Sequence, residues 1–354
     1  MKKILVTGTA GFIGFHLINK LKNSSWKIVG LDNINNYYDV DLKYARLQQT
    51  GISKDEISYS KPVPSSVIPF YQFIQLDLCD KEKISELFRQ EQFDGVIHLA
   101  AQAGVRYSMT NPHAYTESNV TGFLNILEGC RAVNVKHLVY ASTSSVYGLN
   151  TDMPLTPHKG ADHPISLYAA TKKANEMMAH SYSHLFKLPV TGVRFFSAYG
   201  PWGRPDMALF MFTKAILNKE PIRVFNNGDM VRDFTYVDDI TDALCKILEK
   251  PAQPDPQWNS NKPDPARSSA AYKILNIGNS NPVKLMDYIA ALENALGLKA
   301  IKEMLPMQPG DVPATNADIS DIMEDYGYKP HTHIKKGIEN FVNWYLDYYK
   351  ISTV

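Results

Sequence analysis

Cysteine is scarce in this sequence, with only Cys79, Cys130 and Cys245 among 354 residues, far apart in the chain. Because no Cys-x-x-Cys pair and no Cys/His cluster occurs, neither a disulfide framework nor a metal site is indicated. Apolar runs are short as well: none approaches the about 18 residues that cross a bilayer, and the amino-terminal run is too short for a secretory signal. We therefore expect a soluble, cytoplasmic protein with no membrane partner.

An excess of charge of either sign is also missing. The 37 Lys and Arg residues balance 36 Asp and Glu residues, which gives a net charge of +1, and no basic block occurs. Such a balance gives no indication of nucleic acid or of an anionic membrane as a partner. With 44% hydrophobic and 21% charged residues, the composition is that of a globular protein with a sizeable core.

Short β-branched runs alternate with amphipathic stretches through the first half of the chain, an order that is typical of βα units building a parallel sheet. We expect strands at 3–7, 26–32, 71–77, 94–100, 137–143 and 190–195. These elements predict a Rossmann-type, doubly wound α/β domain over 1–195, to which segments near 230–250 and 272–278 return. Residues 50–69, rich in Ser and Pro, are expected to form a surface excursion.

The character of the sequence changes after residue 195. Elements become shorter, and a stretch near 251–271, rich in Pro, Asn and Ser, is typical of a mobile linker. Three helical patterns follow a short strand, the last of them at 334–349. We expect residues 196–354 to form a smaller, mostly helical lobe.

A glycine-rich turn follows the first expected strand and opens an amphipathic helix. Its sequence is Gly8-Thr9-Ala10-Gly11-Phe12-Ile13-Gly14, and such a turn lets backbone N–H groups approach a pyrophosphate at the helix N-terminus. Asp32 ends the second expected strand, where a carboxylate can accept both hydroxyls of an adenosine ribose and repels a 2′-phosphate. Because no Arg lies nearby before Arg46, this pattern favours NAD over NADP as the cofactor, with Asn33 as a further cofactor-binding candidate.

Asp77 and Leu78 end the third expected strand. They are placed to meet the adenine of the cofactor, although an Asp at this position is equally a cap for the next helix. Both roles stay open at this point.

Tyr168 is the only tyrosine with a lysine four residues on, Lys172. On a helix the two share a face, so the ammonium favours the ionised phenol that a base needs. The fifth expected strand ends in a run of hydroxyls, Ser142-Thr143-Ser144-Ser145, at the edge where ligands bind in this architecture. Without the tyrosine and lysine, the run would be read as a loop cap.

In combination, these motifs resemble the extended short-chain dehydrogenase/reductase family, and within it the nucleotide-sugar 4-epimerases, through essentially the whole chain. The resemblance implies that Thr143 and Tyr168 contact O4 of the sugar, that Tyr168 is the base, and that Lys172 also holds the nicotinamide ribose. Hydride would leave C4 to NAD and return to the other face of the rotated 4-keto sugar. Ser144 and Ser145 stand where related dehydratases have Asp and Glu, and Ser145 stands where related decarboxylases have Glu, which leaves plain epimerisation.

The string Gly-Pro-Trp-Gly-Arg-Pro-Asp-Met-Ala at 200–208 resembles UDP-glucuronate 4-epimerases. By that resemblance Arg204 pairs with the sugar carboxylate, assisted by Ser197, where the family usually has Thr, and by Ser144. A bidentate arginine would also hold the carboxylate out of alignment with the 4-keto group and so prevent loss of CO2. The alternative role for Arg204 is a loop-stabilising surface ion pair.

Further positions resemble residues that bind the nucleotide. Arg232 corresponds to a diphosphate-binding arginine, Gln308 and Asp311 belong to a segment that closes over phosphate and ribose, and Arg106 faces either the sugar or solvent. Gln308 stands where several relatives have Arg, which leaves one fewer positive charge on the diphosphate. The resemblance therefore makes 196–354 the nucleotide-sugar-binding lobe.

The prediction is a UDP-glucuronate 4-epimerase that uses NAD and serves polysaccharide biosynthesis. A 4-epimerase of UDP-glucose or UDP-N-acetylglucosamine is the enzymatic alternative, and a non-catalytic NAD-binding sensor is the alternative from another class. Relatives dimerise through two long helices, which here fall at about 113–133 and 166–185, so a homodimer is expected.

Overall fold

The computed structural model describes residues 1–351; the last three residues of the expected lobe, 352–354, lie outside the described part. Eight strands form a central sheet in the order β12-β7-β6-β5-β1-β2-β4-β3. The parallel strands are β1 (Lys3–Thr7), β2 (Lys27–Asp32), β4 (Tyr71–Gln75), β5 (Gly95–His98), β6 (His137–Thr143), β7 (Val190–Phe195) and β12 (Tyr272–Ile277). All six strands expected in the first half form, so the predicted parallel sheet is confirmed.

The segment 50–69 is not only a surface excursion. It contains β3 (Pro62–Pro64), which runs antiparallel to β4 and extends the sheet at its edge. Val63 is buried there, and the flanking prolines are tolerated because an edge strand can do without one row of backbone donors. The burial of a single side chain in a three-residue strand leaves too little pattern for prediction from sequence.

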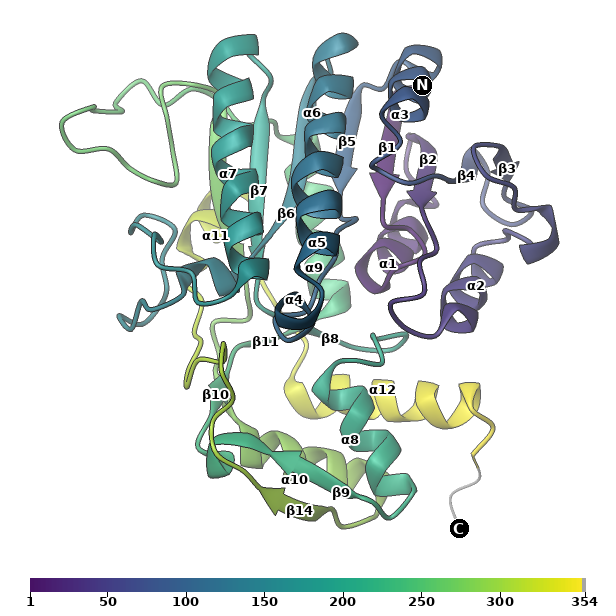
Figure 1. The fold of residues 1–354 in the computed structure, drawn as a ribbon, viewed down its shortest axis with the longest axis vertical. Helices are drawn as coiled ribbons and strands as arrows, with labels where there is room; N and C mark the ends of the chain where they lie inside the picture. The colour runs from purple at the N-terminus through teal and green to yellow at the C-terminus, as the bar shows by residue number, and fades with distance from the viewer. Residues whose placement is uncertain (352–354) are drawn as a thin grey trace.

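Helices cover both faces of the sheet (Figure 1). Ile4 and Val6 of β1 belong to one apolar cluster, with α1 (Phe12–Leu21) and α9 (Val237–Glu249). Leu5 belongs to the cluster on the other face, with α3 (Lys81–Glu91), α6 (Gly122–Ala132) and α7 (Leu167–Phe186). Because all three β1 side chains are fully buried, the strand reads as a continuous apolar run, as parallel strands covered on both faces do.

The smaller lobe lies below the sheet in Figure 1 and has its own apolar cluster. Its helices are α8 (Ala208–Leu217), α10 (Leu285–Leu296) and α12 (Ile334–Tyr348), to which short strands β9 (Pro221–Val224) and β14 (Ile301–Met304) are added. Phe234 and Tyr288 stack at 4.1 Å between ring centroids in this cluster. The three helical patterns expected after the last sheet strand form α10, α11 (Ser320–Tyr326) and α12.

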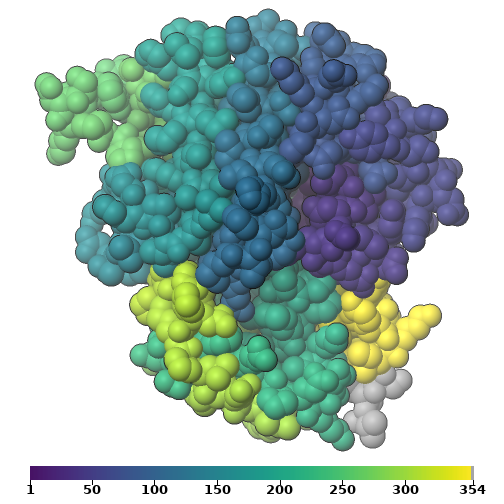
Figure 2. Space-filling model, in the orientation of Figure 1, coloured from purple at the N-terminus to yellow at the C-terminus, as the bar shows by residue number. Residues whose placement is uncertain are grey.

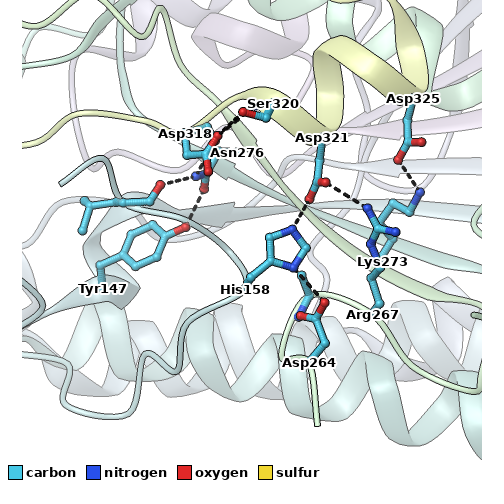
Figure 3. A network of polar contacts seen from close by, with 12 residues as sticks. Tyr147, His158, Asp264, Arg267, Lys273, Asn276, Asp318, Ser320, Asp321 and Asp325 are labelled. Carbon is cyan, nitrogen blue, oxygen red and sulfur yellow. Dashed lines mark hydrogen bonds and ion pairs between the residues drawn. The ribbon is translucent and has the colours of Figure 1, made fainter. Parts of the chain in front are cut away.

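The stretch 251–271 carries no helix or strand and extends outward at the upper left of Figure 1. A polar network holds its inner end (Figure 3). Both ring nitrogens of His158 lie 2.7 Å from carboxylate oxygens, one of Asp264 and one of Asp321. Arg267 donates to the other oxygen of Asp321 at 2.9 Å. The network therefore ties this stretch to α11 and to the loop that carries His158.

A second set of contacts runs from the same region to the inside of the sheet (Figure 3). Tyr147 donates its hydroxyl to Asn276 at 2.7 Å, and the Asn276 amide donates to the carbonyl oxygens of Leu155 and Asp318.

None of the helices within 1–351 combines the length and the apolar character needed to cross a membrane.

Candidate active site

A cavity of about 1100 Å³ lies between the carboxyl ends of the parallel strands and the smaller lobe. Figure 2 shows the larger body above the lobe, with the surface hollowed where the purple amino-terminal and blue segments meet. Every residue predicted from the sequence to bind cofactor, to bind substrate or to act in catalysis lines this cavity. The fold therefore brings together residues from 8 to 311 at the sheet edge where the architecture places ligands.

Close backbone contacts in the turn after β1 require glycine at positions 8 and 14. Gly8 has φ +79°, and a Cβ there would lie 2.9 Å from the amide nitrogen of Ala100; a Cβ on Gly14 would lie 2.1 Å from the carbonyl oxygen of Gly8. The helix α1 begins at Phe12 after Gly11, which has no side chain to cap it. The first N–H groups and the positive end of the helix dipole are thus available to an anion, which fits the pyrophosphate of a dinucleotide.

Asp32 is oriented by two backbone N–H groups, those of Ala10 at 3.2 Å and Ile34 at 2.9 Å. The nearby Arg46 is fully buried and donates to the carbonyl oxygens of Ala10 and Trp202 at 2.9 and 2.7 Å. Because this guanidinium is bound to the backbone, it is not directed toward a 2′-phosphate. The pocket beside Asp32 therefore fits NAD better than NADP.

Of the two roles left open for Asp77, the helix cap is excluded. The cap of α3 is Asp80, which accepts a hydrogen bond from the N–H of Lys83 at 3.1 Å. Asp77 instead accepts from the side-chain amide of Asn33 at 2.9 Å and from the N–H of Cys79 at 2.8 Å. Asp77, Leu78 and Asn33 thus form one wall of the cavity beside Asp32.

The helix α7 presents Tyr168 and Lys172 to the cavity one turn apart. It begins after Ser166, whose hydroxyl accepts from the N–H of Ala169 at 3.2 Å and so caps the helix. Burial raises the pKa of the Tyr168 phenol, while the Thr143 hydroxyl and Arg204 act to lower it. Burial also lowers the pKa of the Lys172 ammonium to about 8, because a charge is costly away from water.

Thr143 ends β6 and is also the cap of the short turn that follows it. Its hydroxyl accepts from the N–H of Ser145 and donates to the Ser145 hydroxyl, both at 3.2 Å. Ser144 lines the cavity beside them. Capping the turn and offering hydroxyls to a ligand are therefore compatible roles for this run, because the capped turn directs its hydroxyls into the cavity.

Arg204 forms an ion pair, but the pair lies in the cavity wall rather than at the surface. Its Nε donates to Oδ1 of Asp206 at 2.9 Å, and its Nη2 donates to Oδ2. Tyr37 donates its hydroxyl to Oδ2 of the same carboxylate at 3.0 Å. Sequence reasoning missed Asp206 and Tyr37, although Asp206 stands in the string 200–208 that carries the resemblance.

The lobe and the segment around 308–313 form the end of the cavity that is predicted to bind the nucleotide. Arg232 donates to the carbonyl oxygens of Val312 and Pro313 at 2.7 and 3.1 Å. Arg106 lies 3.6 Å from Asp311, with its guanidinium 5.0 Å from the ring centroid of Phe225. Gln308 and Ser197 also line the cavity, and Oε1 of Gln308 is buried without a partner within residues 1–351.

Comparison with known proteins places the chain in a family. Residues 4–261 match the NAD dependent epimerase/dehydratase family. The chain belongs to this family. The membership expected from the sequence and the Rossmann-type fold are therefore confirmed.

Individual members of the family are similar over nearly the whole chain. Protein CapI of Staphylococcus aureus is 52% identical over 348 residues, which cover 98% of this chain and 99% of CapI. UDP-glucuronate 4-epimerase 4 of Arabidopsis thaliana is 44% identical over 354 residues, covering 98% of this chain and 76% of that protein. The crystal structure of UDP-glucuronic acid 4-epimerase from Bacillus cereus, in complex with UDP-glucuronic acid and NAD, matches with a TM-score of 0.82 and 31% identity, covering 98% and 100% of the two chains.

In this member of the epimerase/dehydratase family, a buried ion pair positions α7 against the sheet. Glu176, one turn beyond Lys172, accepts from Nε and Nη2 of Arg194 on β7 at 2.9 and 2.8 Å. Ser142 of β6 donates to the same carboxylate at 2.7 Å. Glu176 and Arg194 are both fully buried. The face of α7 that carries Tyr168 is thereby fixed in register with the end of β6.

Asn119 is a second residue that sequence reasoning did not single out. Its side chain accepts from the N–H of Gln102 at 2.8 Å and donates to the Gln102 carbonyl at 3.0 Å. It also donates to the hydroxyl of Thr171 on α7 at 3.1 Å. Asn119 thus links the loop after β5 to α7, and only the tertiary structure reveals this link because the three residues are far apart in the sequence.

Proposed function

We propose that this chain is an NAD-dependent 4-epimerase that interconverts UDP-glucuronate and UDP-galacturonate through a transient 4-keto sugar. The observation that carries the proposal is the position of Arg204: it lines the same cavity as Tyr168 and Thr143, and its charge acts on the Tyr168 phenol. A carboxylate-binding cation thus stands beside the base that would act at C4. The relatives named UDP-glucuronate 4-epimerases support the same substrate.

When bound, NAD supplies reversible hydride acceptance from C4 of the sugar. The residues that would hold it are the glycines of the 8–14 turn at the pyrophosphate, Asp32 at the adenosine ribose, and Lys172 at the nicotinamide ribose. Lys172 is buried one helical turn beyond Tyr168 and lines the same cavity, so its ammonium would add positive charge there. No metal is needed for these steps.

Proton transfer at O4 falls to Tyr168. As hydride leaves C4, the phenolate takes the proton of the O4 hydroxyl, and it returns that proton when hydride is delivered to the other face. Thr143 holds O4 within reach of the phenol through its hydroxyl, which interacts with Tyr168. A positioned base of this kind contributes about 10²–10⁴-fold to the rate.

The orientation of the sugar carboxylate must also be fixed during the reaction. Oxidation at C4 makes a β-keto acid, which loses CO2 when the C5–C6 bond aligns with the carbonyl π system. Arg204, assisted by Ser197 and Ser144, would hold the carboxylate out of that alignment. Arg232, Gln308 and Asp311 would bind the nucleotide at the other end of the cavity, and Arg106, which also lines the cavity, would face the sugar.

The test is to incubate the purified protein with UDP-glucuronate, without added reductant, and to follow the sugar by proton NMR. We expect UDP-galacturonate to appear without release of CO2. UDP-glucose and UDP-N-acetylglucosamine are the comparison substrates; faster conversion of either would replace the proposed substrate with a neutral one. No conversion of any of the three, with NAD added, would favour a non-catalytic NAD-binding sensor.

We also propose that the protein works as a cytoplasmic homodimer that supplies polysaccharide synthesis. Exposed apolar side chains gather on the two expected helices: Leu124 is 40%, Met177 49% and Leu185 64% exposed. Such a surface is favourable for pairing with a second copy. The thiols are all free, as in proteins of a reducing compartment. Light scattering that shows only monomer at micromolar concentration would contradict the dimer.

We further propose a division of labour along the chain. Residues 1–195, with the segments near 230–250 and 272–278, would bind NAD, and the remainder of 196–354 would bind the nucleotide sugar. The strand β12 lies in the central sheet beside β7, which supports the return of the chain to the first domain.

A further inference from the structure

One edge of the Arg204 guanidinium is already occupied by the protein. The turn after residue 200 folds back, with the N–H of Met207 donating to the Arg204 carbonyl at 3.1 Å, and brings Asp206 beside Arg204. Both Asp206 oxygens then accept from the Nε and Nη2 edge of the guanidinium. Tyr37 reaches the same carboxylate from a segment 169 residues away.

The other edge remains available. A guanidinium has five N–H groups in a planar fork, and its Nη1 and Nη2 edge can bind a second carboxylate bidentately. Within residues 1–351 the side-chain hydrogen bonds of Arg204 use Nε and Nη2 only. Arg204 and Asp206 are 22% and 27% exposed and line the cavity. The pair is therefore accessible to a ligand while its orientation is fixed by the protein.

We infer that Asp206, held in place by Tyr37, is a positioning residue that determines specificity by directing the free edge of Arg204 at the sugar carboxylate. This inference rests on the proposed function and deepens it. Arginine alone provides charge, whereas Arg204 bound by Asp206 provides charge in one fixed plane. Fixing that plane sets the rotation of the carboxylate about the C5–C6 bond.

Rotation about that bond decides which product forms. In the 4-keto intermediate, loss of CO2 breaks the C5–C6 bond, its electron pair enters the C4 carbonyl as an enolate, and a proton then adds at C5. The product is a UDP-linked 4-keto pentose. A mobile Arg204 would allow the aligned rotamer, so loss of Asp206 should divert turnovers from epimerisation to decarboxylation.

The experiment compares Asp206→Asn and Tyr37→Phe with the wild-type enzyme on UDP-glucuronate and UDP-glucose, measuring kcat, KM and released CO2. Asp206→Asn keeps the size of the side chain and removes its charge and one strong acceptor. We expect the ratio of kcat/KM for UDP-glucuronate over UDP-glucose to fall about tenfold, with CO2 rising above the wild-type level. Tyr37→Phe should produce smaller changes in the same directions.

The matched control is Tyr107→Phe. Tyr107 lines the same cavity, and its ring lies 4.8 Å from that of Tyr37, but its hydroxyl accepts from Asn111 and not from the Arg204 network. This variant should leave the substrate ratio and CO2 unchanged. If Asp206→Asn fails to fold, Tyr37→Phe, which removes a single hydroxyl, still gives the answer.

The outcomes separate the two proposals. A wild-type enzyme that does not epimerise UDP-glucuronate overturns the proposed function and this inference with it. A wild-type enzyme that does so, together with variants that keep the wild-type substrate ratio and release no more CO2, overturns the positioning role of Asp206 alone. A loss of rate that is equal on both substrates, with unchanged CO2, also contradicts it, because that pattern is what a merely structural role produces.

Discussion

The guanidinium of Arg204 acts across the cavity to lower the pKa of the Tyr168 phenol, and Asp206 opposes this effect. The group proposed to bind the sugar carboxylate is therefore electrostatically coupled to the group proposed to move the proton at O4. The Thr143 hydroxyl also acts to lower the pKa of this phenol, and Lys172 lies one helical turn away. The charges of the pair proposed to recognise the substrate therefore also affect the pKa of the phenol proposed to move the proton.

This coupling predicts opposite pH shifts for two variants. Arg204→Met removes a cation, which raises the pKa of Tyr168, so the acidic limb of kcat should move to higher pH. Asp206→Asn removes an anion, which lowers that pKa, so the limb should move to lower pH. Profiles of kcat at saturating substrate check both signs, and shifts in the same direction would contradict the coupling.

Tyr168→Phe should abolish most of the turnover and leave ligand binding intact. The phenyl ring keeps the packing against Tyr115, whose ring centroid lies 6.1 Å away, and only the proton-transferring hydroxyl is lost. We expect kcat to fall by about 10²–10⁴-fold, with NAD content and UDP affinity close to wild type. Tyr182→Phe, on the same helix with its hydroxyl on Glu128, is the control and should retain full activity.

The buried pair between Glu176 and Arg194 should matter for both stability and register. Glu176→Gln leaves the fully buried guanidinium of Arg194 without its counter-charge, and we expect the free energy of unfolding to fall by about 3–5 kcal/mol. The double variant Glu176→Gln/Arg194→Met should recover much of that loss, because it removes the unpaired charge as well. Urea titrations of the three proteins measure the difference. Equal stability of Glu176→Gln and wild type would argue against the pair as an anchor.

His158 makes stability depend on pH at the sheet edge (Figure 3). Hydrogen bonding to Asp321, followed by that to Asp264, raises its pKa from 6.5 to about 9 in the folded protein. A raised folded-state pKa means that the stabilisation is complete below pH 6.5 and is lost as the pH rises through 9. The melting temperature of His158→Gln should therefore lie below wild type at pH 6 and approach it at pH 10. Equal melting temperatures of His158→Gln and wild type at pH 6 would contradict this role of His158.

Gly14→Ala should weaken cofactor binding, because its Cβ would lie 2.1 Å from the Gly8 carbonyl oxygen and force the turn open. We expect the affinity for the dinucleotide to fall by roughly tenfold or more. Titration with NADH, monitored by its fluorescence, measures this affinity. Gly160→Ala meets only the side chain of Asp162 and serves as the control. Wild-type affinity in Gly14→Ala would show that the turn tolerates a side chain and would remove the argument for a pyrophosphate there.

The sequence reveals this fold well where burial leaves a regular pattern. Strands such as Lys3–Thr7 and His137–Thr143 are buried on both faces, so their apolar runs and the glycine turn after the first strand are visible without coordinates. The short strand at Val63 is not, because one buried side chain makes no pattern. The expected surface excursion at 50–69 was therefore wrong in that part.

Side-chain pairing is the part that sequence does not determine. The motif containing Arg204 indicates a carboxylate-binding arginine, but which edge of the guanidinium Asp206 occupies depends on rotamers and on Tyr37 from a distant loop. Likewise, the sequence leaves two roles open for Asp77, and only the backbone geometry assigns the cap of α3 to Asp80 instead. Local propensity fixes elements, while long-range contacts select among polar partners.

Arg46 joins the two loops on which both halves of the chemistry depend. Its buried guanidinium bonds to the carbonyl of Ala10 in the glycine turn and to those of Trp202 and Gly203 in the loop that carries Arg204. One buried side chain therefore holds the glycine turn at 8–14 and the loop at 200–208 together. A substitution of Arg46 would change the proposed dinucleotide site and the proposed sugar site at once.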